Sequence, residues 1–98
     1  MIDLQELQKK IYQNKLDKGF NTKDIHLEFN YIYGELSEAF DAYLKEKGNV
    51  GEELADVAIY LLGLSEILGV NLETEILEKM KINKARKYKK EGGGHTKI

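Results

Sequence analysis

With 98 residues, of which 42% are hydrophobic and 33% charged, the chain suits one folded domain and has the composition of neither a disordered nor a membrane protein. It has no cysteine, which excludes disulfides and thiolate ligands, and its net charge of −2 gives no general attraction to nucleic acid. It also has no proline, and its first residues lead directly into an amphipathic pattern, so we expect uninterrupted helices, no signal peptide and a cytoplasmic location.

The first two predicted helices are amphipathic. The first begins after an N-cap at Asp3 and ends near Gly19. The second begins after a cap at Asn21 or Thr22 and continues to about Lys47. Their apolar residues recur every three or four positions, which predicts one packed face on each helix. These stripes are Leu4, Leu7, Ile11 and Leu16 in the first helix, and Ile25, Phe29, Ile32, Leu36, Ala39 and Tyr43 in the second.

The third predicted helix is apolar around nearly its whole circumference. It begins after Asn49 and ends before Gly69. A helix that is apolar all round is normally buried, and a chain this short needs a second copy to bury it. Gly34 and Gly63 lie inside helices, where each costs about 1 kcal/mol relative to alanine, so we expect close helix packing at both.

The fourth predicted helix is capped by Asn71 and runs to about Tyr88, and the glycines after it indicate a loose tail. We therefore predict an all-α fold of four helices, a bundle that is completed by assembly into a homodimer or homotetramer. Residues 1–91 would form one helical domain and residues 92–98 a flexible Gly-rich tail. The longest apolar run, 57–64, is too short to span a membrane.

Two pairs of carboxylates are the main functional signal. Glu35 and Glu38 lie three residues apart in the second predicted helix, and Glu53 and Asp56 lie three residues apart in the third. Residues at this spacing share a side of a helix, so each pair points one way. If the two sides meet, four like charges converge and need a cation. Oxygen ligands suit Mg²⁺ or Mn²⁺, which makes a magnesium site the first hypothesis.

A basic face on the fourth predicted helix offers a place for phosphate. Lys79, Asn83 and Arg86 are spaced by four and three, and Lys and Arg at this position can either bind phosphate oxygens or complement the helix dipole. A di-iron site is excluded by ligand type, because neither His26 nor His95 follows a glutamate in a Glu-x-x-His pattern.

With these residues in place, the chain resembles the all-α nucleoside triphosphate pyrophosphohydrolases, the MazG-like family. Three segments carry the resemblance: GELSEA at 34–39, EELADVAIYLLGL at 52–64 and LEKMKINKARKY at 77–88. Members cleave a nucleoside triphosphate between the α- and β-phosphates with Mg²⁺, giving monophosphate and pyrophosphate. The resemblance covers residues 25–88 and is closest to a short single-domain subgroup.

The resemblance also implies roles for individual residues. Glu35, Glu38, Glu53 and Asp56 would hold the metal, and Lys79, Asn83 and Arg86 would bind substrate. In the mechanism that we expect, Glu38 and Glu53 are the catalytic residues and Glu38 accepts the proton of the attacking water. We add Glu28 to the substrate-binding residues, because it can partly substitute for glutamates that the chain lacks.

One departure from the family pattern leaves alternatives open. Tyr31 and Ile32 stand where typical members carry further glutamates one turn before the GE pair, and Glu28 lies another turn back. The chain could therefore be a non-catalytic oligomeric module that binds nucleotide or protein at a degenerate metal site. A third hypothesis is that the chain acts as the related phosphoribosyl-ATP pyrophosphohydrolase.

Overall fold

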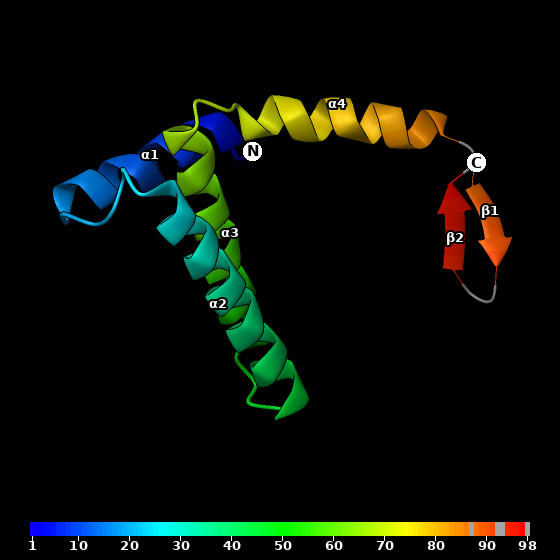
Figure 1. Ribbon diagram of the computed structural model, residues 1–98, viewed down its shortest axis with the longest axis horizontal. Coiled ribbons are helices and arrows are strands. Elements are labelled where there is room, and N and C mark those ends of the chain that lie inside the picture. The colour runs from blue at the N-terminus through cyan, green and yellow to red at the C-terminus, as the bar shows by residue number, and fades with distance from the viewer. Residues whose placement is uncertain (87, 92–93, 98) are drawn as a thin grey trace.

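The computed structural model describes residues 1–86, 88–91 and 94–97, which form four helices followed by a small hairpin (Figure 1). The predicted all-α architecture with four helices is confirmed. The helices are α1 (Leu4–Asp17), α2 (Ile25–Leu44), α3 (Val50–Ile67) and α4 (Leu72–Ala85). The strands β1 (Tyr88–Glu91) and β2 (Gly94–Lys97) pair antiparallel, with Tyr88 opposite Lys97.

Helices α2 and α3 form an antiparallel hairpin, and α1 crosses one end of it against α3 (Figure 1). Helix α4 contacts α1 and then extends away from the α2–α3 hairpin. It ends at Ala85, three residues before the predicted end at Tyr88, because Arg86 already has an extended backbone (ψ 144°) and leads into β1. Strand β2 falls within the predicted tail, whose residues 92, 93 and 98 lie outside the described residues.

Polar side chains define where the helices begin. Asp3, Asp24 and Asn71 each accept a hydrogen bond from the main-chain N–H three residues later, at 3.0, 3.1 and 3.2 Å. The caps of α1 and α4 are as predicted, whereas α2 begins after Asp24 and not after Asn21 or Thr22. The reason is that Asn21 Oδ1 accepts from the Asp24 N–H at 3.1 Å, which forms a turn before the helix starts.

The turn that follows α2 contains a residue other than glycine in the left-handed conformation. Helix α2 ends at Leu44, three residues before the predicted end at Lys47, and Glu46 in the turn adopts φ 51°. The Lys47 N–H reaches the Ala42 carbonyl at 3.1 Å, which closes the helix with a Schellman motif. A side chain in this conformation costs about 1–2 kcal/mol.

Glu46→Gly should therefore stabilise the protein. We expect the free energy of unfolding in urea to rise by about 0.5–1 kcal/mol, because the relief of strain exceeds the entropy that glycine adds to the unfolded chain. Lys45→Gly is the matched control, since Lys45 has an ordinary negative φ of −93° and the substitution should lower stability. Equal destabilisation by both substitutions would contradict this account of the turn.

The face of α1 that packs inward differs from the predicted stripe. Leu7 and Leu16 are exposed, whereas the polar residues Gln8 and Lys15 are buried. Gln8 is satisfied by the end of α3, since its Nε2 donates to Glu66 Oε1 at 2.9 Å. Hydrogen bonding and charge pairing thus decide which side of α1 is covered.

Close helix packing was expected at Gly34 and Gly63, and the structure shows it at Gly63. At Gly63 a Cβ would lie 3.3 Å from Lys15 Cδ and 3.4 Å from Ile11 Cγ2, so this residue lets α1 approach α3. At Gly34 a Cβ would meet nothing within 4 Å, so contacts within one chain do not explain that glycine.

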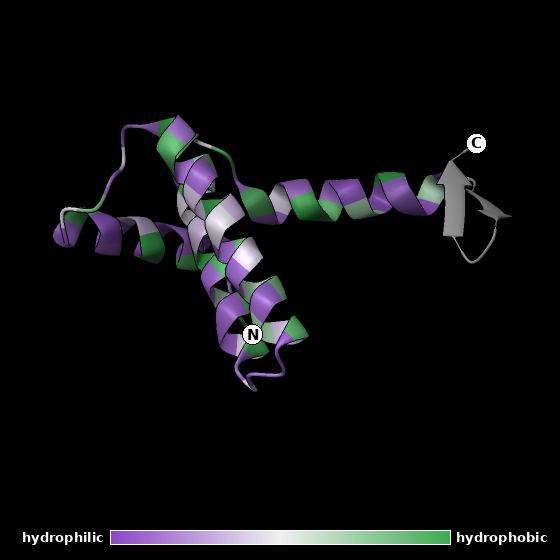
Figure 2. Ribbon diagram, turned by 60° about the horizontal axis from the view of Figure 1, so that its bottom comes forward, coloured by the Kyte–Doolittle hydropathy of each residue, from purple (hydrophilic) through white to green (hydrophobic). Residues whose placement is uncertain are grey.

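A single copy buries few apolar side chains. The buried hydrophobic residues of the described chain are Ala39, Ala42, Leu62 and Leu64. The expected all-round burial of α3 is not reached in one copy, since Leu54, Ile59 and Leu61 are exposed. Apolar positions also recur along the projecting α4 (Figure 2). Across the described residues, no helix is both long and apolar enough for a membrane crossing.

Candidate metal centre

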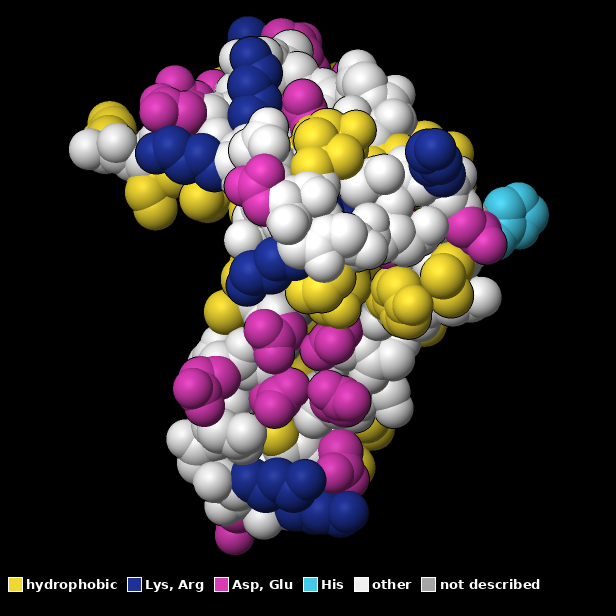
Figure 3. All heavy atoms as spheres, turned by 90° about the vertical axis from the view of Figure 1, so that its left-hand side faces the viewer, with side chains coloured by type: hydrophobic (Ala, Val, Ile, Leu, Met, Phe, Trp, Pro, Cys, Tyr) yellow, Lys and Arg dark blue, Asp and Glu magenta, His cyan; other side chains and the backbone are white. Residues whose placement is uncertain are grey.

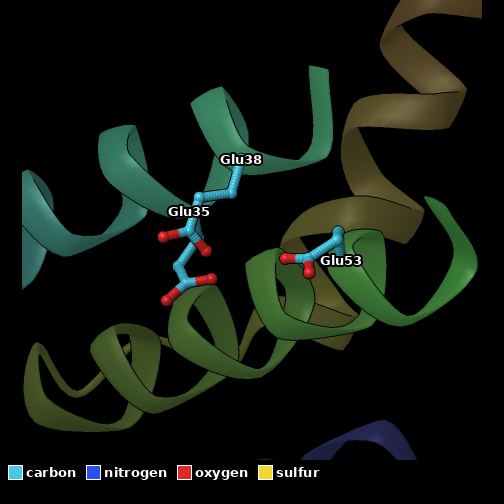
Figure 4. A group of neighbouring side chains, drawn as sticks. All are labelled: Glu35, Glu38 and Glu53. Carbon is cyan, nitrogen blue, oxygen red and sulfur yellow. The ribbon is translucent and has the colours of Figure 1, made fainter. Parts of the chain in front are cut away.

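Carboxylates from α2 and α3 meet where the two helices face each other. Glu35 and Glu38 project from α2 and Glu53 projects from the first turn of α3 (Figure 4). Each of the three offers an oxygen, and these oxygens all lie within 4.8 Å of one another. The helical spacing of three residues places the first two on one side of α2. We call Glu35, Glu38 and Glu53 the carboxylate cluster.

Asp56 lies outside this group of three but adds to its charge. The pKa of the Glu35 carboxyl is raised, first by burial and then by the negative charges of Glu38, Asp56 and Glu53. The cluster therefore sits in a negative field that a divalent cation would relieve. Figure 3 shows acidic side chains gathered on one face of the α2–α3 hairpin.

An unpaired buried oxygen points to the same chemistry. Glu53 Oε1 accepts from Asn49 Nδ2 at 3.2 Å, and this contact replaces the helix-capping bond expected of the Asn49 side chain. Glu53 Oε2 and Asn49 Oδ1 are buried without a hydrogen-bond partner among the described residues. Buried oxygens without a donor are costly. Carboxylate and amide oxygens are ligands for hard cations, so the residues present fit Mg²⁺ or Mn²⁺.

On one side, the cluster opens into a cavity of about 440 Å³ that Glu38 and Glu53 help to line. Asp41 and Lys47 also line this cavity and form an ion pair, with Lys47 Nζ 3.0 Å from Asp41 Oδ2. Hydrogen bonds from Lys47 and then Lys45 lower the pKa of Asp41, so this carboxylate is neutralised by its own partners. Glu38 is exposed here and can be reached by water.

On the other side, the cluster is bordered by a buried ion pair. Glu28 lies two turns before Glu35 on α2, is 1% exposed and is paired with Lys15 of α1, which is 7% exposed. Glu28 Oε2 also accepts from Asn21 Nδ2 at 3.2 Å. The burial of Lys15 was not predicted, although its spacing of four from Ile11 places it on the face of α1 that carries Leu4.

Tyr60 of α3 lies beside the ion pair and feels the charges of the cluster. The Lys15 Nζ is 5.4 Å from the centroid of its ring, and the Tyr31 ring is 5.8 Å away at 55°. Burial, followed by the charges of Glu35 and Glu28, raises the pKa of the Tyr60 hydroxyl, which therefore stays protonated and can donate a hydrogen bond.

The structure does not bring the basic residues of α4 to the carboxylates within one chain. Lys79 and Asn83 are exposed, and Arg86 Nη1 donates to Asn83 Oδ1 at 3.4 Å. Lys79 and Asn83 lie on α4 and Arg86 directly follows it, and α4 leaves the bundle beside α1. The predicted phosphate-binding group is therefore separate from the cluster in a single copy.

Comparison with known proteins gives one match. A model of the MazG-like family matches residues 26–97, which include both carboxylate pairs and the basic face of α4. Neither a curated protein nor a solved structure matches the chain.

Proposed function

Because the chain belongs to the MazG-like family, we propose that it is a Mg²⁺-dependent nucleotide pyrophosphohydrolase. Its substrate would be a nucleoside triphosphate, cleaved between the α- and β-phosphates to monophosphate and pyrophosphate. The observation that carries the proposal is the meeting of Glu35, Glu38 and Glu53, with carboxylate oxygens within 4.8 Å of one another. Such a group would suit a divalent cation, which would neutralise the charge of the substrate's phosphates.

In this proposal Glu35, Glu38, Glu53 and Asp56 would hold Mg²⁺ or Mn²⁺, and the metal would neutralise phosphate charge and lower the pKa of a water. Glu38 is exposed to the adjoining cavity and accepts the proton of the attacking water. The water oxygen bonds to phosphorus while the bond to the leaving pyrophosphate breaks. Asn49 donates to Glu53 Oε1, which would leave the buried and unpartnered Oε2 available as a metal ligand.

We propose that a second copy completes the site. Lys79, Asn83 and Arg86 would hold phosphate oxygens at the cluster of a neighbouring chain, since α4 extends away from its own. Exposed apolar side chains support a homodimer or homotetramer, because a second copy would cover them. Those on α3 and α4 are Leu54, Ile59, Leu61, Ile76, Leu77, Met80 and Ile82.

The test is a panel of nucleoside triphosphates with Mg²⁺, read out as pyrophosphate. We expect release from at least one member and none in EDTA. Pyrophosphate release that persists in EDTA would contradict the metal mechanism. If the nucleotides bind in calorimetry but no member of the panel is cleaved, the alternative of a non-catalytic nucleotide-binding module is favoured. The Tyr31 side chain packed against Tyr60, where a glutamate could otherwise stand, is the observation behind that alternative.

Mg²⁺ binding should weaken as the pH falls from neutrality towards the raised pKa of Glu35, because protons compete for ligands that must be ionised. Glu35 takes up a proton at a higher pH than an ordinary carboxyl, owing to burial and neighbouring charge. The metal-free protein should behave in the opposite way and gain stability as the pH falls through this raised pKa, since the folded state binds the proton more tightly.

Calorimetric Mg²⁺ titrations across this pH range test the weakening of metal binding, and urea unfolding of the metal-free protein tests the gain in stability. Glu35→Gln should flatten the pH dependence of stability. A metal-free protein that loses stability over the same range, with Glu35→Gln behaving identically, would contradict the assignment.

A further inference from the structure

A buried glutamine side chain holds the start of α4 to α1. Gln8 of α1 is 1% exposed and reaches the turn that joins α3 to α4. Its Nε2 donates to Glu66 Oε1 at 2.9 Å and to the Val70 carbonyl at 2.6 Å. Its Oε1 accepts from the Leu72 N–H at 3.3 Å. Gln8 therefore binds the last turn of α3, the connecting turn and the first residue of α4 at once.

A second contact runs in the opposite direction between the same two helices. Glu73, in the first turn of α4, accepts from the Leu4 N–H with its Oε1 at 3.0 Å. Leu4 and Leu72 are the first residues of α1 and α4, and such N–H groups have no partner within their own helix. Each helix thus supplies an acceptor for the first N–H of the other, in addition to the caps by Asp3 and Asn71.

The contacts at its first turn decide the direction of α4, because little else holds this helix. Helix α4 has no buried side chain, contacts mainly α1 and extends away from the α2–α3 hairpin (Figure 1). Asn83 lies about 16 Å along the helix axis from Leu72, so a change of about 20° in direction would move it by about 6 Å. That displacement exceeds the length of a hydrogen bond.

The hydrogen bonds of Gln8 favour one direction of α4 over others. A buried amide costs free energy unless it is hydrogen-bonded, and here both N–H donors and the oxygen of Gln8 are used. Turning α4 away would break the bonds to Val70 and Leu72 and leave the buried amide partly unsatisfied. Hydrogen bonds also depend on angle, so they define an orientation and not only a distance.

We propose that Gln8 is a positioning residue, which holds α4 in the direction from which its substrate-binding residues reach the carboxylate cluster of a neighbouring chain. Those residues are Lys79, Asn83 and, directly after the helix, Arg86. The inference rests on the proposed function, which places these side chains on the phosphates at a second copy. Gln8 itself lies outside the cluster and outside the cavity that adjoins it. Its loss should therefore weaken substrate binding more than turnover.

The direction of α4 can be measured with two spin labels, because the chain has no cysteine of its own. Lys10→Cys in α1 and Lys81→Cys in α4 are exposed labelling positions, and dilution into unlabelled protein restricts the measured distance to one chain. Gln8→Glu would set a carboxylate against Glu66 and the Val70 carbonyl, and should widen the distance distribution at least about twofold. Adding Glu66→Gln removes the repulsion and restores a donor between the two side chains, so the distribution should narrow again.

Gln13→Glu on the same helix is the matched control. Gln13 donates to Asp17 Oδ1 at 2.9 Å, but this contact is exposed, so the same substitution should leave the direction of α4 unchanged. If Gln8→Glu does not fold by circular dichroism, Gln8→Met takes its place. It removes the hydrogen bonds at similar size without burying a charge, and it should also widen the distribution.

Cleavage assays connect the direction of α4 to the reaction. Gln8→Glu should raise KM for the nucleoside triphosphate about tenfold and change kcat by less than about threefold, and Glu66→Gln in addition should restore KM. An unchanged distance distribution in the Gln8 variants would overturn the positioning role whatever the activity. A wider distribution with an unchanged KM would overturn it as well, because the direction of α4 would then not serve substrate binding.

Failure of the proposed function would be recognised separately, by a wild-type protein that cleaves no triphosphate. The distance distributions still report the direction of α4 in that case, and the Kd of the nucleotide in calorimetry replaces KM. A wider distribution together with weaker nucleotide binding in Gln8→Glu would support the positioning role. A Kd equal to that of the wild type, or no binding by the wild type, would overturn it.

Discussion

Glu53→Gln should lower kcat/KM for Mg²⁺-dependent pyrophosphate release by about 10²–10³-fold. The side chain keeps its size, so the fold should remain, but one carboxylate oxygen becomes an amide that cannot bind a cation. In the structure Glu53 Oε1 is already held by Asn49 and Oε2 is buried without a partner, so either placement of the amide harms the site. Turnover with each triphosphate and calorimetric Mg²⁺ binding are the measurements.

The matched control is Glu52→Gln, one residue earlier in the first turn of α3. Glu52 is exposed and outside the group of converging carboxylates, so its substitution removes the same charge without removing a ligand. It should retain turnover within about twofold, because an exposed charge has little effect at this range. Equal losses in both variants would show that net charge, and not ligation by Glu53, governs activity.

Lys15→Met should destabilise the protein by about 3–5 kcal/mol, the usual effect of leaving one member of a buried ion pair without its partner. Glu28 would remain 1% exposed beside the carboxylate cluster with no cation to compensate it. The double variant Lys15→Met/Glu28→Met should recover most of that loss, since two apolar side chains of similar size can replace a buried pair. Urea unfolding at one fixed protein concentration measures all three proteins.

Lys10→Met on the same helix provides the comparison. Lys10 is paired with Glu6 at 3.4 Å, but both side chains are more than 60% exposed. Removing such a pair should change stability by less than about 1 kcal/mol. If Lys15→Met is as stable as Lys10→Met, or if the double variant is no more stable than Lys15→Met, the buried pair does not have the role assigned to it.

Helical periodicity made much of the fold and of the candidate site predictable. The four helices follow from apolar residues at spacings of three and four, and from caps such as Asp3 and Asn71. The same spacing indicated that Glu35 and Glu38 share one side of α2, since this depends only on the geometry of one helix.

The inward face of α1 was not predictable in the same way. An apolar stripe predicts burial of Leu7 and Leu16, but Lys15 is buried because Glu28 of α2 and the ring of Tyr60 of α3 receive its ammonium group. Gly63 leaves room for the Lys15 stem to pass between α1 and α3. These partners lie on other helices, and periodicity within α1 contains no information about them.

The position of α4 could not be derived from its own sequence either. The spacing of Lys79, Asn83 and Arg86 predicts one polar face. The structure places Lys79 and Asn83 on α4 and Arg86 directly after it, and this helix extends away from the carboxylates. The spacing of residues within a helix does not say which chain the helix will pack against. The exposed apolar residues of α3 and α4 are the physical reason for placing that face at a second copy.

The most direct test of the account is the identity of the reaction products. A nucleoside triphosphate is incubated with the protein and Mg²⁺ and followed by phosphorus NMR. The account predicts equimolar nucleoside monophosphate and pyrophosphate, which form at least about 10²-fold more slowly with Glu53→Gln. Nucleoside diphosphate and inorganic phosphate, or products that form at the wild-type rate with Glu53→Gln, would contradict it.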